Sequence, residues 1–297
     1  MPASAPIPNT CSSRVEQRTF SSRADLLARL ATQALIEEAE LTPKPGLVDR
    51  RGPGAHADMT LDTMHRSAHS LFPTFKLIAQ IAERRNPTRQ LREQLGAAGR
   101  NGEREMLVAS GGCNTHRGAI WTLGLLVAAA AMRHPVENAS MIGRCAAQLA
   151  RFQDRHAPAS STNGSVVARI YRVAGARGEA KLGFPHIVQI GLPALLEARA
   201  KGTSEDRARL DALMAIMASL VDTCLLHRGG LHALEIAKKG ALEVLRKGGT
   251  GTADGFGALM SLDASLFGFK ASPGGSADLL AGTLFVDFLI RHFPWKQ

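Results

Sequence analysis

Apolar residues recur at helical spacing along most of the chain and predict a succession of helices joined by glycine-rich segments. In the first helix, over 23–40, five residues share one face: Leu26, Leu27, Leu30, Ala31 and Ala34. The pattern predicts further helices near 61–84, 89–109, 117–133, 137–152, 185–200, 205–226, 231–247, 253–267 and 276–292. We find no alternating strand and no internal repeat. The sequence therefore predicts an all-α fold with a single compact catalytic domain over 23–297.

The first 22 residues differ from the rest because they are rich in Pro, Ser and Arg and lack the apolar core of a signal peptide. We expect residues 1–22 to form a disordered tail. The longest apolar run, over 119–132, is shorter than the ~20 residues that a membrane span needs. Four cysteines (Cys11, Cys113, Cys145 and Cys224) have no Cys-x-x-Cys spacing. They are typical of reduced thiols, so we expect a cytoplasmic protein without a membrane segment.

Composition agrees with a helical protein and indicates an anionic partner. Of the 297 residues, 45% are hydrophobic but only 5% are aromatic, which favours helices over sheets. The net charge of +10 favours nucleic acid, a membrane surface or a small phosphorylated ligand as partner. No Lys/Arg block, zinc-finger spacing or aromatic-basic RNA motif occurs, so we expect phosphorylated ligands rather than nucleic acid.

The segment from Thr42 to Met59 is the strongest candidate for a functional loop. It holds three prolines and three glycines in 18 residues, which excludes a continuous helix or a central strand. Its polar residues are Lys44, Asp49, Arg50, Arg51, His56 and Asp58. A charged surface loop would also fit, but acids, bases and cations on a stiff loop favour an active site.

Glu38 falls on the apolar face of the first helix, where an unpaired carboxylate is costly. Either the helix end frays and releases Glu38 to water, or the carboxylate points into the site and holds a cation. We favour the second interpretation.

A second cluster, over 111–118, precedes an apolar helix and reads Gly-Gly-Cys-Asn-Thr-His-Arg-Gly. Asn114 or Thr115 can cap that helix. Capping does not explain the glycine pair or the cationic residues His116 and Arg117, whereas a phosphate site at a helix amino terminus does. The segment is no Walker P-loop, because the Gly-Lys-Ser/Thr ending is missing.

Three later motifs repeat this combination of glycine and charge. Arg177 and Glu179 lie in a predicted turn, where a solvated ion pair is the alternative to a site. Asp222, His227 and Arg228 lie near the end of the predicted helix over 205–226, where cations can simply complement the helix dipole. In the last motif, Ser276 can cap a helix and Asp278 can occupy its first turn. That structural account of the last motif is sufficient by itself.

These motifs together resemble a known family. Pro-Lys-Pro-Gly-Leu-Val-Asp and Gly-Ala-His-Ala-Asp-Met occur within 42–59, and Asn-Thr-His-Arg-Gly-Ala-Ile follows at 114–120. Gly-Ala-Arg-Gly-Glu-Ala (175–180), Gly-Phe-Pro (183–185), Asp-Thr-Cys-Leu-Leu-His-Arg-Gly-Gly (222–230) and Ser-Pro-Gly-Gly-Ser-Ala-Asp-Leu-Leu-Ala (272–281) complete the series. In this order they are similar to the triphosphoribosyl-dephospho-coenzyme A synthases. Cys113 and Cys224 depart from the citrate-lyase-type pattern, and the Asp-Thr-Cys form resembles the malonate-decarboxylase type.

The resemblance implies a transferase that joins the 5-triphosphoribosyl group of ATP to the 2′-hydroxyl of 3′-dephospho-coenzyme A and releases adenine. The product is the precursor of the prosthetic group of malonate decarboxylase. Displacement at an anomeric carbon needs a base, donors for the leaving group and cations for the triphosphate. The resemblance also implies Mg²⁺, held through carboxylates and phosphates. It allows a homo-oligomer and implies neither a nucleic-acid nor a membrane partner.

The candidate residues for this chemistry fall into three groups. The catalytic candidates are Asp49, His56, Asp58 and Asp222. The metal candidates are Glu38, Asp49 and Asp58. The substrate-binding candidates are Lys44, Asn114, Thr115, His116, Arg117, Arg177, Glu179, His227, Arg228, Gly274, Gly275 and Asp278. Two other functions fit the same residues: a nucleoside or ADP-ribosyl hydrolase with water as acceptor, and a non-catalytic basic RNA-binding protein.

Overall fold

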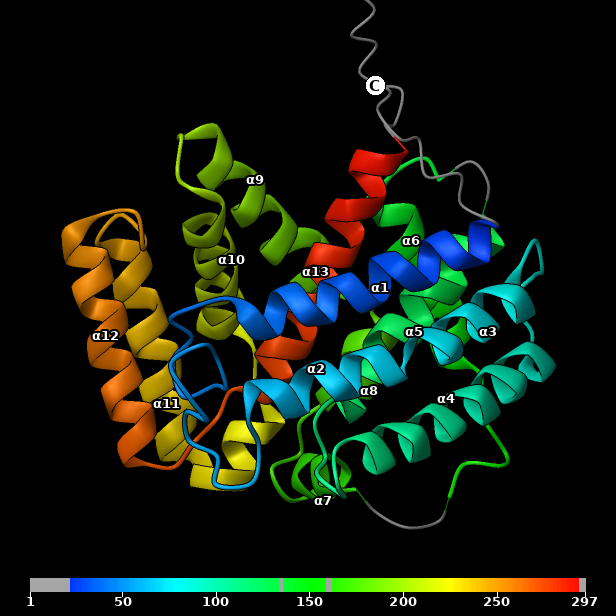
Figure 1. Ribbon diagram of the computed structural model, residues 1–297, viewed down its shortest axis with the longest axis horizontal. Helices are drawn as coiled ribbons and strands as arrows, with labels where there is room; N and C mark the ends of the chain where they lie inside the picture. The colour runs from blue at the N-terminus through cyan, green and yellow to red at the C-terminus, as the bar shows by residue number, and fades with distance from the viewer. Residues whose placement is uncertain (1–21, 134–135, 159–161, 294–297) are drawn as a thin grey trace, which may run out of the picture.

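The computed structural model describes residues 22–133, 136–158 and 162–293, and these residues form an all-α domain (Figure 1). The helices are α1 (Arg23–Glu40), α2 (Leu61–Ser70), α3 (Phe72–Ala82), α4 (Arg89–Ala109), α5 (Arg117–Met132), α6 (Ala139–Arg151), α7 (Asn163–Ile170), α8 (Gly175–Lys181), the π-helix η1 (His186–Gly191), α9 (Leu192–Ala200), α10 (Glu205–Ser219), α11 (Thr223–Arg246), α12 (Ala253–Gly268) and α13 (Gly274–His292). Within the described residues the only β pairing is an isolated bridge between Asp49 and Gly52. The all-α prediction is confirmed. The predicted tail, apart from Ser22, lies outside the described residues.

Half of these helices begin at a polar side chain that accepts a hydrogen bond from a free backbone N–H, as expected for N-caps. These capping residues are Ser22, Thr60, Thr88, Asn138, Thr162, Asp222 and Thr252. Each stands one residue before an amphipathic or apolar stretch. Local sequence and tertiary packing therefore agree on where these helices start.

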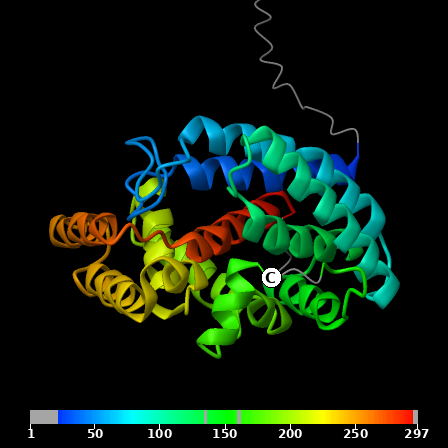
Figure 2. The ribbon, with the colours of Figure 1, turned by 90° about the horizontal axis from the view of Figure 1, so that it is seen from below.

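The core is arranged around two apolar helices, α13 and α5. Figures 1 and 2 show α13 running through the middle of the molecule, with α1 across it and α11 and α12 side by side at one edge. α13 packs on α1, α5 and α10. Nearly every residue from Ser276 to Leu289 is buried, as is every residue of α5 from Thr122 to Met132. The amino-terminal ends of both central helices carry the polar motifs.

Two of the predicted helices are broken where the apolar pattern continues. The stretch over 61–84 divides at Leu71 into α2 and α3, because Pro73 lies in the first turn of α3 and cannot donate to the preceding helix. The stretch over 205–226 divides between Ser219 and Thr223, with a bend of 65° between α10 and α11. Leu220 there is extended and Asp222 starts a new helix.

Further differences concern helix boundaries near the glycine motifs. The predicted end near residue 226 and restart at 231 correspond to a kink at Gly230, whose φ of 64° is non-helical. The segment predicted as a turn around Arg177 is a short helix, α8. The helix predicted over 185–200 begins as the π-helix η1. In the part of the chain that the structure describes, no single helix is long and apolar enough to cross a membrane, and only the bent pair α10–α11 meets length and composition criteria together.

Candidate active site

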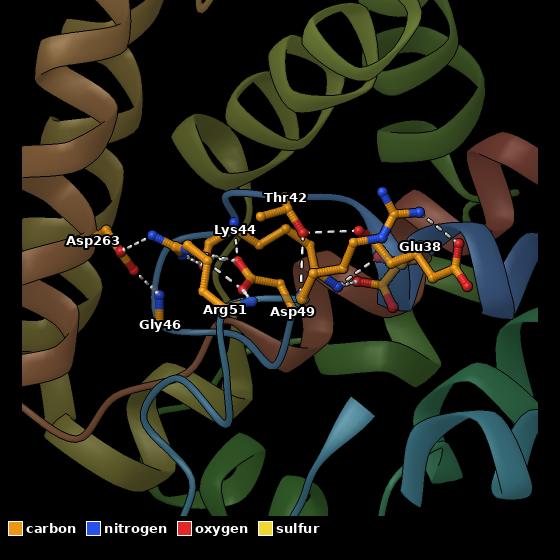
Figure 3. A network of polar contacts seen from close by, with 9 residues as sticks. Glu38, Thr42, Lys44, Gly46, Asp49, Arg51 and Asp263 are labelled. Atoms are coloured by element: carbon orange, nitrogen blue, oxygen red, sulfur yellow. Dashed lines mark hydrogen bonds and ion pairs between the residues drawn. The ribbon is translucent and has the colours of Figure 1, made fainter. Parts of the chain in front are cut away.

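The loop between α1 and α2 is held by a network of ion pairs centred on Asp49 and Arg51 (Figure 3). Asp49 accepts from the backbone N–H of Lys44 at 2.8 Å and pairs with the Arg51 guanidinium at 2.8 Å. Arg51 also reaches Asp263 on α12 at 2.7 Å, and Asp263 accepts from Gly46 N at 2.9 Å. A β-carbon at Gly46 would lie 2.5 Å from the carbonyl oxygen of Ala271, so this close approach requires glycine. The network fixes the loop against α12.

This anchoring delivers Lys44 to the interior. Its side chain is 1% exposed, and its ammonium lies 2.6 Å from the carboxylate of Glu38 while also donating to the carbonyl of Glu38. Glu38 is itself buried, so the end of α1 is not frayed. The cation that Glu38 holds is therefore the Lys44 ammonium, and both side chains border a cavity.

The cavity has a volume of about 510 Å³, within the ~300–1,000 Å³ typical of small-molecule sites. It is lined by the end of α1, the loop over 42–59, α4, the amino-terminal end of α5, and residues from α7, α8, α11 and α13. Cationic side chains occur on two sides. Arg92, Arg100 and Arg177 come from α4 and α8, whereas His227 and Arg228 come from α11.

Asp278 brings a carboxylate to the meeting point of α13 and α5. A β-carbon at Gly118 would lie 1.9 Å from its Oδ2, so only glycine in the first turn of α5 allows this approach. Burial, followed by repulsion from the carboxylates of Glu38 and Asp222, raises the pKa of Asp278 well above its ordinary value. A carboxylate with a raised pKa is, in its ionised form, a stronger proton acceptor than an ordinary aspartate.

His116 offers the cavity a buried nitrogen with no partner. Its Nδ1 lies 2.7 Å from the Ser67 hydroxyl, while its Nε2 makes no hydrogen bond within the described residues. Burial and the nearby Lys44 ammonium lower the pKa of His116 to about 3, so the ring is neutral at pH 7. An unsatisfied buried nitrogen is costly, which favours a ligand that pairs with it.

His56 is instead held between two protein groups. Arg228 donates to its Nδ1 at 3.1 Å, so the ring proton is on Nε2, which donates to the Ser272 hydroxyl at 2.9 Å. Burial, then the Arg228 charge, lower the pKa of His56 to about 4. The ring therefore positions Arg228 and Ser272 at the cavity, and both of its nitrogens are occupied.

The structure brings most of the predicted site residues onto this one cavity. They are Glu38, Lys44, His56, Asn114, Thr115, His116, Arg117, Arg177, His227, Arg228, Gly274, Gly275 and Asp278. Asp49, Asp58, Asp222 and Glu179 do not line it. Of the three carboxylates predicted to hold a metal, only Glu38 faces the cavity.

Asp49 and Asp222 were predicted as catalytic acids. In the structure both carboxylates accept hydrogen bonds from backbone N–H groups and hold the chain in place. Asp49 is occupied by Lys44 N and Arg51, as described above. Asp222 caps α11 through Cys224 N at 2.8 Å and accepts from the N–H and hydroxyl of Ser276, at 2.8 and 2.9 Å. It thereby joins the amino-terminal ends of α11 and α13. Its oxygens are used before any substrate arrives.

Asp58 and Glu179 also lie away from the cavity. The Asp58 side chain is 62% exposed and stands 3.8 Å from His56. Glu179 is buried and pairs with the backbone N–H and ring of His186, both at 2.8 Å. The alternative of a solvated ion pair between Arg177 and Glu179 does not hold, because Glu179 is buried and pairs with His186 of η1.

Two capping predictions are also wrong. Neither Asn114 nor Thr115 caps α5, whose N-cap is His116 without a side-chain hydrogen bond. α13 begins at Gly274, so Ser276 lies in its first turn and donates to Asp222. Polar side chains that would otherwise cap these helices are left to face the cavity or to join helices.

The sequence prediction missed a group on α4 and the loop after α6. Arg92, Arg100 and Asp154 line the cavity, with Trp121 of α5 beside Arg92. Arg92 and Arg100 are eight residues apart, which places them on one helix face. That spacing is the one signal that could have indicated them.

The side chains on the cavity fit Mg²⁺ only if substrate phosphates supply part of its coordination. No group of three His, Cys, Asp or Glu side chains within the described residues is arranged to hold a metal. Glu38 and Asp278 nevertheless both line the cavity, so two carboxylates face the same space. Mg²⁺ commonly binds through one or two carboxylates together with substrate phosphates and water, and this pair suits such a role.

The three cysteines that the structure describes form neither a disulfide nor part of a metal-ligand cluster. Cys113, Cys145 and Cys224 are free, and Cys11 lies outside the described residues. Burial, then the charge of Asp222, raise the pKa of Cys224 well above its ordinary value, so it stays a thiol at the cavity wall. It behaves as a small packing residue.

A cavity of this kind on an all-helical scaffold, with buried carboxylates among cations, is typical of an enzyme that acts on phosphorylated substrates. Residues 24–297 match the family model described as ATP:dephospho-CoA triphosphoribosyl transferase (CitG). The chain belongs to this family. It is an enzyme, and the sequence-based prediction of a transferase is confirmed.

Individual relatives agree along nearly the full chain. A 2-(5″-triphosphoribosyl)-3′-dephosphocoenzyme-A synthase of Klebsiella pneumoniae is 53% identical over 90% of this chain and 95% of its own length. A probable synthase of the same name from Stutzerimonas stutzeri is 52% identical, over 92% and 94%. One from Pseudomonas fluorescens Pf-5 is 52% identical, over 91% and 94%. No solved structure matches the chain.

Proposed function

We propose that this enzyme transfers the 5-triphosphoribosyl group of ATP to the 2′-hydroxyl of 3′-dephospho-coenzyme A and releases adenine. The observation that carries the proposal is the pair of carboxylates, buried Glu38 and half-buried Asp278, which line a cavity with cations on two sides. Both substrates carry polyphosphates on the 5′ carbon of a ribose, whereas the reacting atoms are C1′ and O2′. A carboxylate centre between cationic walls suits that distribution of charge.

Asp278 is the residue we assign as general base. It takes the proton from the 2′-hydroxyl as O2′ forms a bond to C1′ of ATP and the C1′–N9 bond breaks. The bonding electrons leave with adenine as the N9 anion, which takes a proton from water to become neutral adenine, while Asp278 returns its proton to the solvent. His116, in the tautomer with its proton on Nε2, is the buried donor available to hydrogen-bond the departing ring.

Lys44 and Glu38 complete the centre. The Lys44 ammonium pairs with the Glu38 carboxylate at 2.6 Å, and the Glu38 charge contributes to the raised pKa of Asp278. Glu38 and Asp278 are the two residues that would hold Mg²⁺, which when bound neutralises negative charge on the triphosphate. The Asp49–Arg51 network positions Lys44 without touching substrate.

Adenine release measured by liquid chromatography tests the proposal. We expect release from ATP only when dephospho-coenzyme A is present. Release at the same rate without acceptor would support the nucleoside or ADP-ribosyl hydrolase and contradict the transferase. No release under either condition, together with salt-sensitive RNA binding, would support the non-catalytic alternative.

For the biological role, we propose that the product serves malonate decarboxylase rather than citrate lyase. The proposal is supported by the Asp222-Thr223-Cys224 form of the α11 motif and by the Arg50-Arg51 pair in the loop. The chemistry is the same in both pathways, so an assay of the enzyme cannot separate them. Deleting the gene should abolish growth on malonate and leave citrate fermentation intact; the opposite pattern would assign the enzyme to citrate lyase.

A further inference from the structure

Three arginines gather on one wall of the cavity, away from the carboxylate centre. Arg92 and Arg100 lie on α4 and Arg177 on α8, and we call them the α4–α8 arginine cluster. The Arg92 guanidinium stands 5.0 Å from the centre of the Trp121 ring, whose Nε1 donates to the carbonyl of Ala176 at 3.2 Å. Trp121 thus joins α5 to α8 and supports Arg92 by a cation–π contact.

The cluster carries more positive charge than its surroundings neutralise. Among the described residues, Asp154 is the one carboxylate that pairs with it, at 2.7 Å from Arg100 and 3.7 Å from Arg92. Asp154 also accepts from His156 N at 2.9 Å. Arg177 makes no hydrogen bond or ion pair within the described part of the chain. The cluster therefore holds three guanidinium groups and one carboxylate, which pairs with only two of them.

Burial makes this imbalance costly. The Arg92 side chain is only 11% exposed, and its Nε is buried without a partner. Burial lowers the pKa of Arg92, an effect that Asp154 opposes and that Arg100 and Arg177 strengthen. Arg177 is exposed, so the cost of burial falls on Arg92, and an anion bound against Arg92 offsets that cost.

The cluster is closely packed rather than loosely placed. A β-carbon at Gly96 would lie 2.0 Å from Asp154 Oδ2 and 2.9 Å from Arg92 Nη1, so glycine on α4 is required for both side chains to approach the helix. Three planar guanidinium groups facing a cavity match the oxygens of a phosphate chain, which arginine binds through paired hydrogen bonds.

We propose that the α4–α8 arginine cluster, supported by Trp121, is a dedicated subsite for the polyphosphate chain of one nucleotide substrate. The phosphates of the other substrate would then bind on the other side of the cavity, near Arg228. The identity of the nucleotide rests on the proposed function, since ATP and dephospho-coenzyme A both supply such a chain. The subsite itself is defined by phosphate chemistry.

Arg177→Ala is the sharpest variant, because removing this side chain leaves no carboxylate unpaired. The matched control is Arg169→Ala, an exposed arginine on α7 outside the cavity. Calorimetry with inorganic triphosphate should show binding weakened roughly 10–100-fold in Arg177→Ala and little changed in Arg169→Ala. Thermal melting of both variants verifies that they remain folded.

Titrations with ATP and with dephospho-coenzyme A then identify the occupant. The nucleotide whose affinity falls in parallel with that of inorganic triphosphate occupies the subsite, while the other should bind as to the wild type. Unchanged triphosphate binding, or an equal loss for both nucleotides, would overturn the proposal. Triphosphate binding needs no turnover, so a loss in Arg177→Ala without any triphosphoribosyl product would retain the subsite and refute the proposed function instead.

Discussion

The closest contact between helices at the active site is the approach of Asp278 to Gly118, and Gly118→Ala tests what depends on it. The added β-carbon would lie 1.9 Å from Asp278 Oδ2, whereas real β-carbon contacts are essentially never shorter than 3.0 Å. The carboxylate must therefore retreat by about 1 Å. Because it is the end of a side chain with free torsions, it can do so without moving either helix.

Gly118→Ala should affect stability and activity differently. Alanine is favoured over glycine in a helix by up to about 1 kcal/mol, so the free energy of unfolding should be unchanged or slightly raised. A displacement of about 1 Å in a catalytic group costs on the order of 10²-fold in rate, or about 2.7 kcal/mol. We expect kcat to fall about 100-fold in a protein that is as stable as the wild type.

Adenine release gives kcat, and urea denaturation gives stability. The matched control is Gly257→Ala on α12, where a β-carbon meets nothing within 4 Å. That variant should keep full activity. A Gly118→Ala enzyme with normal kcat would refute the assignment of Asp278, and a joint loss of stability and activity would show that the contact is structural.

Three further predictions follow from buried groups and from the acceptor. His116 has a pKa of about 3 in the folded protein, so the unfolded chain takes up the proton first and stability falls as the pH drops below about 6.5. Between pH 7 and 5 the wild type should lose roughly 2 kcal/mol more than His116→Asn in urea titrations; parallel curves would contradict this. Asp222→Ala should cost roughly 2–3 kcal/mol, because Asp222 caps α11 and holds α13, whereas the single cap lost in Thr252→Ala should cost about 1 kcal/mol. Equal losses in the two variants would exclude the double role of Asp222. Dephospho-coenzyme A should be turned over and coenzyme A rejected, because a 3′-phosphate beside the attacking hydroxyl leaves no close approach to C1′; comparable turnover of both would refute a closed acceptor pocket.

The sequence could not predict which of its glycine pairs line the cavity. The sequence holds glycine pairs at 111–112, 229–230 and 274–275, and each pair would allow a close backbone approach to substrate. Only Gly274 and Gly275 line the cavity, and a β-carbon at Gly275 would meet Asp222 at 2.9 Å. Gly275 thus makes room for the carboxylate of Asp222. The sequence alone does not indicate this contact, because the two residues are far apart in the chain.

Most of the fold followed from periodicity because local and tertiary preferences agree. Thr60, Thr88 and Thr252 each stand one residue before a helix that the apolar pattern predicts. Asn138 caps its helix one residue inside the predicted start at 137, and the short helix α7 after Thr162 was not predicted. The break at Leu220 was missed because its neighbours Met217 and Leu225 continue the helical period on both sides of the bend. Tertiary packing outweighs the local pattern there.

The sequence predicted where the candidate site lies better than it predicted what each residue does there. Loop motifs identified the residues around the cavity, since polar side chains beside proline and glycine are rarely needed for a core. The sequence could not separate Asp278, which faces the cavity, from Asp49 and Asp222, which are satisfied by backbone N–H groups. Arg92 and Arg100 resemble an ordinary solvated helix face until the packing of α4 against α5 is known.

Mass spectrometry of the products of ATP and 3′-dephospho-coenzyme A tests the central claim most directly. The account predicts one new species that contains both reactants less adenine, with the triphosphate retained. It should form with the wild type and be strongly reduced with Asp278→Asn, which cannot accept the 2′-hydroxyl proton. Free ribose triphosphate in place of the joined product, or undiminished product from Asp278→Asn, would contradict the account.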